Sequence, residues 1–155
     1  MTDVISSDSS FPVALRENLA RLASAMIPEE GEHPAGGHPD ILGALLEHLA
    51  GKADLVREGM QTLEALAEVE HSQTLGALAD AQCLALLPVL MEQQPAFYYL
   101  LQSSLLTAYY QHPATLDAVG VAPRPPYPAG REVRETDWSL LDPVRTRAPF
   151  YREVT

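Results

Sequence analysis

The stretch that decides the fold is PAFYYLLQSSLLTAYYQHPATLDAVG, residues 95–120, which holds the densest aromatic cluster in the chain. Pro95 suits the first turn of a helix, because its missing N–H would have had no partner within the helix there. Pro113 cannot continue a helix and disfavours helical backbone in the residue before it. The helix should therefore end near Gln111 or His112.

Apolar side chains occupy nearly every face of this predicted helix. The positions at three- and four-residue spacing are Phe97, Leu100, Leu101, Ser104, Leu105, Ala108 and Tyr109, whereas Tyr98, Leu106 and Tyr110 fall on other faces. A helix that is apolar all round is usually buried in its domain. We therefore expect this helix to be central, and a short turn over residues 114–119 to follow it and end at Gly120.

Four earlier segments show the apolar spacing of amphipathic helices. They lie between Pro12 and Pro28, from Asp40 to Gly51, from Lys52 to Glu70 and from Asp80 to Glu92. No alternating strand pattern of useful length occurs. The predicted fold class is all-α, a compact bundle of about five main helices over residues 11–120, after a disordered segment at residues 1–10 and before an extended, proline-rich tail at residues 121–155.

Two residues interrupt these predicted helices. Gly59 costs about 0.5–1 kcal/mol relative to alanine in mid-helix, so either a neighbouring helix approaches closely or the glycine is simply tolerated. Pro88 removes a backbone hydrogen bond, which predicts a bend or a break near residues 84–87. The helix that contains Pro88 should bury Leu84, Leu87, Leu90 and Met91 in some combination with Cys83.

Composition limits the classes of partner. The 155 residues suit one domain, and 10 Lys and Arg against 21 Asp and Glu give a net charge of −11. This charge argues against a nucleic acid or an anionic membrane surface as partner. It is concentrated in residues 1–100, which hold 4 basic and 15 acidic side chains. No apolar run approaches the ~20 residues needed to cross a bilayer, so no direct membrane span is predicted.

Short motifs follow one another in a recognisable order along the chain. They are Leu19-Ala20-Arg21-Leu22, Met26-Ile27-Pro28, Arg57-Glu58-Gly59-Met60, Phe97-Tyr98 with a run of leucines, Thr107-Ala108-Tyr109-Tyr110, Pro113, and Gly120 before a proline-rich exit. This series resembles that of the gluconate 2-dehydrogenase small-subunit family. Each motif is weak by itself, because it consists mostly of apolar residues, glycine and proline, so the order of the motifs carries the resemblance.

The resemblance implies a non-catalytic accessory subunit. Proteins of this family accompany a large FAD flavoprotein of the glucose–methanol–choline type, a sugar or alcohol dehydrogenase that the small subunit stabilises, helps to mature or helps to export. FAD is then expected in the partner and no cofactor in this chain, and a cytochrome subunit is a further partner the resemblance suggests. The alternative is a stand-alone helical bundle that binds a small apolar ligand among Met91, Phe97, Tyr98 and Tyr109.

The N-terminus bears on localisation. MTDVISSDSSFPVALREN lacks a basic start, a continuous apolar core and a twin-arginine pair. No secretion signal is visible in it, which predicts a cytoplasmic protein. Many relatives in the resembled family carry an export signal, so the alternative is a periplasmic protein that is exported together with a signal-bearing partner.

The tail at residues 121–155 has the composition of a binding segment. It contains six arginines and the sole tryptophan, and its prolines and aromatics offer contact area at a low entropic cost. Either it covers a partner, with arginines donating forked hydrogen bonds to carboxylates, or it wraps its own bundle. The predicted partner interface consists of Tyr109, Tyr110, His112, Pro113, Pro125, Pro126, Tyr127, Arg131, Arg134, Trp138, Phe150 and Tyr151.

No residues in the sequence point to catalysis, cofactor binding or a metal. The single cysteine, Cys83, excludes an internal disulfide; we expect a buried thiol, with a disulfide to a partner as the other interpretation. His33 and His38 flank a glycine-rich loop beside acidic residues, but a loop gives histidines no fixed scaffold, so no metal site is predicted. His112 should cap the C-terminus of the central helix, where a cationic imidazole is favoured.

Overall fold

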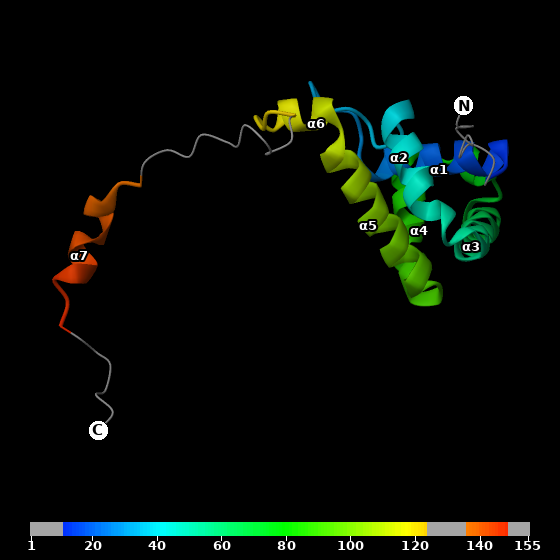
Figure 1. The fold of residues 1–155 in the computed structure, drawn as a ribbon. Helices are drawn as coiled ribbons and strands as arrows, with labels where there is room; N and C mark the ends of the chain where they lie inside the picture. The colour runs from blue at the N-terminus through cyan, green and yellow to red at the C-terminus, as the bar shows by residue number, and fades with distance from the viewer. Residues whose placement is uncertain (1–10, 124–135, 149–155) are drawn as a thin grey trace. The chain divides into compact units, whose positions relative to one another are not determined.

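The computed structural model describes residues 11–123 and 136–148. Its first unit ends at Pro123, close to the predicted domain boundary at Gly120. The helices of this unit are α1 (Val13–Met26), α2 (Pro39–Ala50), α3 (Ala53–His71), α4 (Asp80–Gln93), α5 (Pro95–Gln111) and α6 (Pro113–Ala118), with a 3-10 turn at Leu75–Ala77 (Figure 1). The described residues contain no strand, and the all-α prediction is confirmed. The disorder predicted for residues 1–10 lies outside the described residues.

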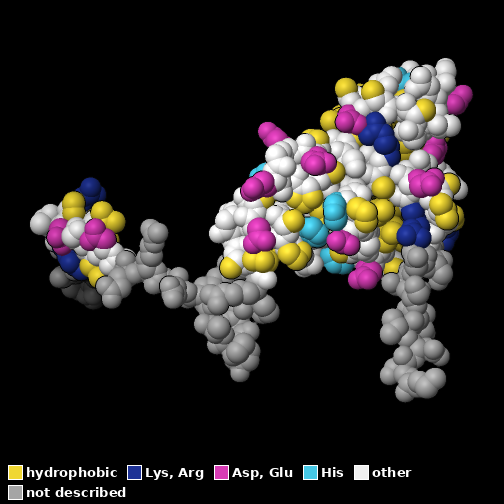
Figure 2. Space-filling model, turned by 90° about the horizontal axis from the view of Figure 1, so that it is seen from above, with side chains coloured by type: hydrophobic (Ala, Val, Ile, Leu, Met, Phe, Trp, Pro, Cys, Tyr) yellow, Lys and Arg dark blue, Asp and Glu magenta, His cyan; other side chains and the backbone are white. Residues whose placement is uncertain are grey.

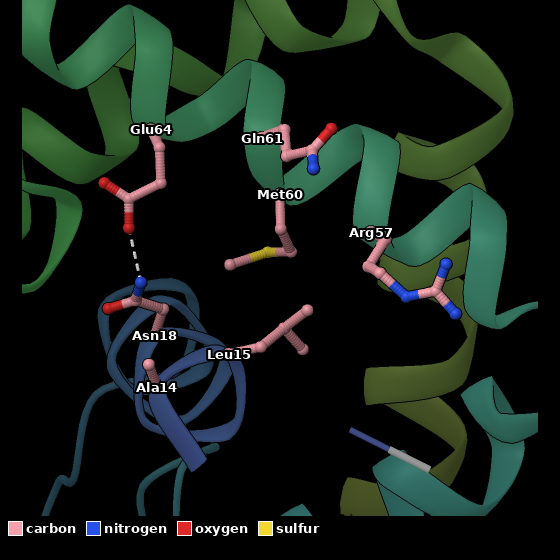
Figure 3. A pocket seen from close by; sticks show the side chains of 7 residues that line it. All are labelled: Ala14, Leu15, Asn18, Arg57, Met60, Gln61 and Glu64. Atoms are coloured by element: carbon pink, nitrogen blue, oxygen red, sulfur yellow. Dashed lines mark hydrogen bonds between the residues drawn. The ribbon is translucent and has the colours of Figure 1, made fainter. Parts of the chain in front are cut away.

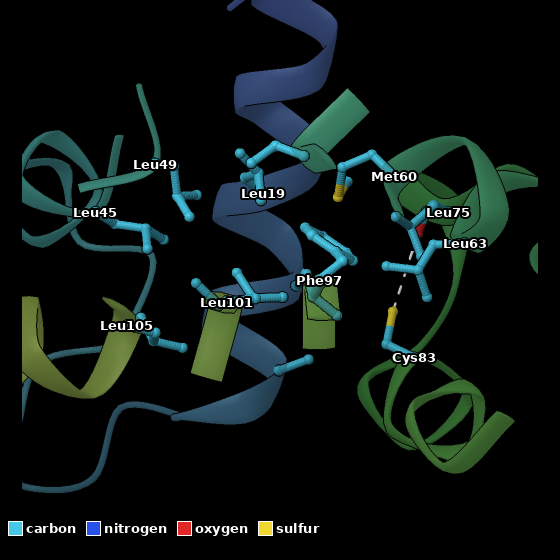
Figure 4. Close-up of a cluster of buried hydrophobic side chains, with 14 of the residues drawn as sticks. Leu19, Leu45, Leu49, Met60, Leu63, Leu75, Cys83, Phe97, Leu101 and Leu105 are labelled. Atoms are coloured by element: carbon cyan, nitrogen blue, oxygen red, sulfur yellow. Dashed lines mark hydrogen bonds between the residues drawn. The ribbon is translucent and has the colours of Figure 1, made fainter. Parts of the chain in front are cut away.

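Helix α5 has the central position that its composition predicts. It packs against α2, α3, α4 and α6, and it begins at Pro95 and ends at Gln111 as expected. Its buried side chains, among them Phe97, Leu101 and Leu105, meet the leucines of the surrounding helices in one core (Figure 4). The other fully buried large residues of this core are Leu19, Leu22, Ile41, Leu45, Leu49, Leu63, Leu75, Leu78 and Leu90.

Gly59 allows α3 to approach α5 closely. A Cβ atom built on Gly59 would lie 2.0 Å from Cδ1 of Phe97, a separation that carbon atoms do not tolerate. Phe97 is fully buried, so its ring has little room to move away. The close approach, one of the two interpretations of this glycine, is therefore confirmed.

Of the bend or break expected near residues 84–87, the structure excludes the break, since Pro88 does not interrupt α4. The helix is continuous from Asp80 to Gln93 because Pro88 lies on its exposed side. The carbonyl of Leu84, which loses its N–H partner to the proline, belongs to an exposed residue. The buried face instead contains Cys83, Leu86 and Leu90. The expected burial of Leu84 and Met91 is thus also wrong, since these side chains are 41% and 39% exposed.

The described part of the tail, residues 136–148, is not extended throughout. It contains a 3-10 turn at Trp138–Leu141 and a single helical turn, α7, at Asp142–Arg145. Asp137 starts the first turn by accepting hydrogen bonds from the Ser139 hydroxyl (2.6 Å) and backbone N–H (3.0 Å). These bonds lower the pKa of the Asp137 carboxyl. The expectation of an extended chain is therefore wrong for residues 138–145. These residues lack the apolar spacing of a helix, but the hydrogen bonds to Asp137 start a turn without it.

Candidate functional site

Three large apolar side chains lie exposed along one face of α5. Tyr99, Leu106 and Tyr110 are 58%, 43% and 55% exposed. Their spacing of seven and four residues places them in one row on the helix, on the side opposite the core-facing residues. We call these three residues the α5 stripe.

The polar residues beside the α5 stripe are satisfied by the helix itself. The hydroxyl of Ser103 donates to the carbonyl of Leu100 (3.1 Å), and the hydroxyl of Thr107 donates to the carbonyl of Ser103 (2.8 Å). Each hydroxyl group therefore already has a hydrogen-bond acceptor within α5. The stripe is therefore a mainly apolar surface on a regular helix.

Each tyrosine of the α5 stripe touches a more buried tyrosine edge-on. The ring centroids of Tyr98 and Tyr99 are 5.4 Å apart, and those of Tyr109 and Tyr110 are also 5.4 Å apart. Edge-to-face pairs at this distance are favourable and restrict ring motion. The exposed rings are thus partly held in place before any partner arrives, which reduces the entropy lost on binding.

A second exposed apolar row lies on α4. Leu84, Pro88 and Met91 are exposed and share one helix face at four- and three-residue spacing. Helix α4 packs against α5 inside the domain. The two helices with exposed apolar rows are therefore neighbours.

The predicted interface residues have different fates in the structure. Tyr110 and Pro113 are exposed, and Trp138 in the second unit is 62% exposed. Tyr109 is only 6% exposed and packs in the core, which leaves little of its surface for a partner. The remaining tail residues of the prediction lie outside the described residues: Pro125, Pro126, Tyr127, Arg131, Arg134, Phe150 and Tyr151.

Burial also changes the chemistry of Tyr109. Desolvation, reinforced by the neighbouring Tyr110, raises the pKa of its hydroxyl. Thr115 lies near enough to oppose this rise slightly, although the Thr115 Oγ1 atom is in no hydrogen bond of good geometry among the described residues. Tyr109 therefore stays a neutral packing residue at physiological pH.

Cys83 is a buried thiol, as expected. Its side chain is fully buried and its sulfur lies 4.0 Å from the carbonyl of Leu75 (Figure 4). Desolvation raises the pKa of the thiol, although the charge of Arg21 opposes the rise. A neutral and inaccessible thiol reacts slowly, so Cys83 has the properties of a core residue in the folded domain.

A hollow of about 280 Å³ lies between α1 and α3 (Figure 3). Leu15 and Met60 form much of its apolar lining. Glu64 at its edge is already engaged, since it accepts hydrogen bonds from the Asn18 amide and from the N–H of Leu75 (3.1 Å). The residues expected to surround an apolar ligand, Met91, Phe97, Tyr98 and Tyr109, do not line this hollow.

His38 lies beside His112 and Asp40, a grouping that the sequence did not suggest. Side-chain ligand atoms of these three residues lie within 4.8 Å of one another. His112 ends α5 as expected, but its imidazole is directed towards Asp40, with 3.8 Å between Nε2 and Oδ2. Among the described residues, His33 does not belong to this group.

The chain matches no protein-family model, no curated protein and no solved structure. None of the described helices is long and apolar enough to cross a lipid bilayer.

Proposed function

We propose that this chain is the non-catalytic accessory subunit of an FAD-dependent dehydrogenase of the glucose–methanol–choline type. The observation that carries the proposal is the α5 stripe, because two tyrosines and a leucine in one row on a central helix form a surface suited to a protein partner. Tyrosine is enriched in protein interfaces and at their energetic hot spots. The partner is named by the motif resemblance.

Helix α5 connects the stripe with that resemblance. Phe97 and Ala108, from two of the motifs, are buried in the core, whereas Tyr110, from the same motif as Ala108, belongs to the stripe. One helix thus carries both the residues that hold the domain together and the residues offered to the flavoprotein. In this role the chain binds, stabilises or matures its partner, and the partner binds FAD and oxidises the sugar or alcohol.

Co-expression with the glucose–methanol–choline flavoprotein encoded in the same genome tests the proposal. We expect the wild-type chain to co-elute with flavin absorbance in size-exclusion chromatography. The variant L106S/Y110S should fold normally but lose co-elution, because it removes apolar area only from the surface. Val69→Ser is the matched control, since Val69 on α3 is 77% exposed and outside the stripe. An undiminished complex with L106S/Y110S would contradict the assignment of the stripe.

Truncation before Pro123 tests the tail separately. We expect the truncated chain to keep the helical circular dichroism of the domain, because the core residues precede residue 123. It should lose co-purification with the flavoprotein if the tail covers that partner. Retention of the complex together with lower thermal stability would indicate instead that the tail wraps its own bundle.

The hollow between α1 and α3 favours a second candidate, a stand-alone bundle that binds a small apolar ligand. Its volume of about 280 Å³ is just below the roughly 300 Å³ at which the range for ligand sites begins. The probe 8-anilinonaphthalene-1-sulfonate tests this function. Support would be saturable binding to the wild-type chain that is lost in a Leu15→Trp variant, whose larger side chain fills the hollow. A wild-type chain that shows no saturable binding would remove it.

A further inference from the structure

We propose that His38, Asp40 and His112 bind a divalent transition-metal ion, with Zn²⁺ as the best match. The site is independent of the α5 stripe and does not rest on the accessory-subunit proposal. Two imidazoles and one carboxylate are the ligand set of many three-ligand zinc sites, in which a fourth position remains open to water or to another donor.

The three side chains converge on one point. Nδ1 of His38 lies 4.0 Å and Nε2 of His112 lies 3.8 Å from the same atom, Oδ2 of Asp40. The two rings are 5.1 Å apart and tilted by 56°, so their nitrogen atoms are not turned away by face-to-face stacking. Figure 2 shows histidine side chains gathered beside acidic ones on one face of the helical domain.

These separations are close to those of a coordinated ion. Two ligands of a tetrahedral Zn²⁺, each 2.0–2.1 Å from the metal, are roughly 3.4 Å apart. The two distances to Oδ2 of Asp40 exceed this value by about 0.4 and 0.6 Å, and all three ligand atoms lie within 4.8 Å of one another. The side chain of Asp40 is 77% exposed and is free to rotate, so it closes the gap without disturbing the core.

A rigid scaffold positions both histidines. Each is the residue before a proline that opens a helix, Pro39 for α2 and Pro113 for α6. The proline holds the preceding backbone extended, as the ψ angles of 138° at His38 and 131° at His112 show. Helix α2 packs directly against α5, whose end carries His112. The site therefore does not depend on the glycine-rich loop alone, which was the reason for predicting no metal.

The surroundings suit a cation. Asp40 supplies one negative charge in the acidic part of the chain, residues 1–100. The side chain of His112 is 13% exposed, whereas that of His38 is 41% exposed, so an ion has access from solvent on one side. Coordination through Nε2 of His112 places the ring proton on Nδ1, a buried atom without a hydrogen-bond partner among the described residues.

A candidate acceptor for that proton lies in the first turn of α6, although it is not hydrogen-bonded to His112 Nδ1 in this structure. Thr115, three residues after His112, has the other buried side-chain atom without a partner among the described residues, its Oγ1. Metal-bound histidines usually donate their second ring N–H to a nearby acceptor, which fixes the tautomer. In the metal-bound protein we assign this role to Thr115. The ion would then join the start of α2 to the junction of α5 and α6.

Zinc titration of the full-length, tag-free chain after dialysis against EDTA tests the site. Isothermal titration calorimetry should give one Zn²⁺ per chain, and at 100-fold the dissociation constant Zn²⁺ should raise Tm by at least about 5 °C. Asp40→Asn and His38→Gln should each weaken binding at least tenfold. The side chains of Asp40 and His38 are 77% and 41% exposed, against 13% for His112, so these variants carry less risk of unfolding than His112→Gln does, and Asp40→Asn also leaves the α2 cap that His38 provides in place.

His48→Gln is the matched control, because His48 is an exposed histidine on the same helix, α2, outside the cluster. It should bind zinc as the wild-type chain does. The proposal is overturned if the wild-type chain shows no stoichiometric binding, or if Asp40→Asn and His38→Gln bind zinc as tightly as His48→Gln.

Discussion

The two faces of α5 have similar side chains and opposite roles. The inner face holds Phe97 and Tyr109, which are 0% and 6% exposed, whereas the outer face holds Tyr99 and Tyr110, which are more than half exposed. The inner residues pack in the core shared with neighbouring helices, whereas the outer rings each make an edge-to-face contact with an adjacent tyrosine. Residue type alone therefore does not tell whether an aromatic side chain of α5 serves the fold or a surface.

The largest effect is expected from emptying the inner face. Phe97→Ala should lower the free energy of unfolding by about 3–5 kcal/mol, because it removes a fully buried ring and leaves a cavity. Urea denaturation followed by circular dichroism measures this loss. Tyr99→Ala on the outer face is the control and should cost less than about 1 kcal/mol. Equal losses for the two variants would remove the distinction between the faces.

Overfilling the same contact should have the next largest effect. Gly59→Ala places a methyl group against the Phe97 ring and should cost about 1–3 kcal/mol, despite the better helix propensity of alanine. In a Phe97→Ala background the same change should become neutral or stabilising, because the clash is gone. Additive losses in the double variant would show that Gly59 does not act through Phe97.

A smaller effect is expected at alkaline pH. Burial raises the pKa of both the Tyr109 hydroxyl and the Cys83 thiol, so the folded protein keeps protons that the unfolded chain releases. Their stabilisation is complete below about pH 8.5 and is lost as the pH rises through their folded-state pKa values. The stability of the wild-type chain should thus decrease more steeply between pH 8 and 11 than that of C83A/Y109F. Parallel pH profiles from urea unfolding would contradict this expectation.

The smallest effect on folding is expected on the outer face. Tyr110→Ser should change the free energy of unfolding by no more than about 0.5 kcal/mol, because the ring is mostly in solvent. Thermal unfolding measures this difference, with Tyr109→Ser as the buried comparison. A loss for Tyr110→Ser as large as that for Tyr109→Ser would mean that Tyr110 supports the fold.

Helix boundaries followed from the sequence because proline has a local effect. Pro95 and Pro113 delimit α5, and one of the two interpretations of Gly59 anticipated the approach of α3. The exposed face of α5 could not be predicted from the sequence, because a helix that is apolar nearly all round has no periodicity to show which side faces solvent. Tyr99 was missed for this reason.

The sequence pattern also could not predict which residues far apart in the chain lie close together in the fold. His38 and His112 lie close together because α2 packs against α5. The spacing of residues along the chain does not predict which helices pack against each other. Similarly, the turn at residues 138–145 depends on capping by Asp137 rather than on an apolar period. Excluding a break at Pro88 needed the same kind of knowledge, namely which side of α4 faces solvent.

Size-exclusion chromatography with an absorbance scan tests the central claim most directly. The chain is expressed alone and together with the glucose–methanol–choline flavoprotein of the same genome. The accessory-subunit proposal predicts co-elution with flavin bands near the combined mass of the two chains. A colourless monomer that elutes at the same volume with or without the flavoprotein would contradict it.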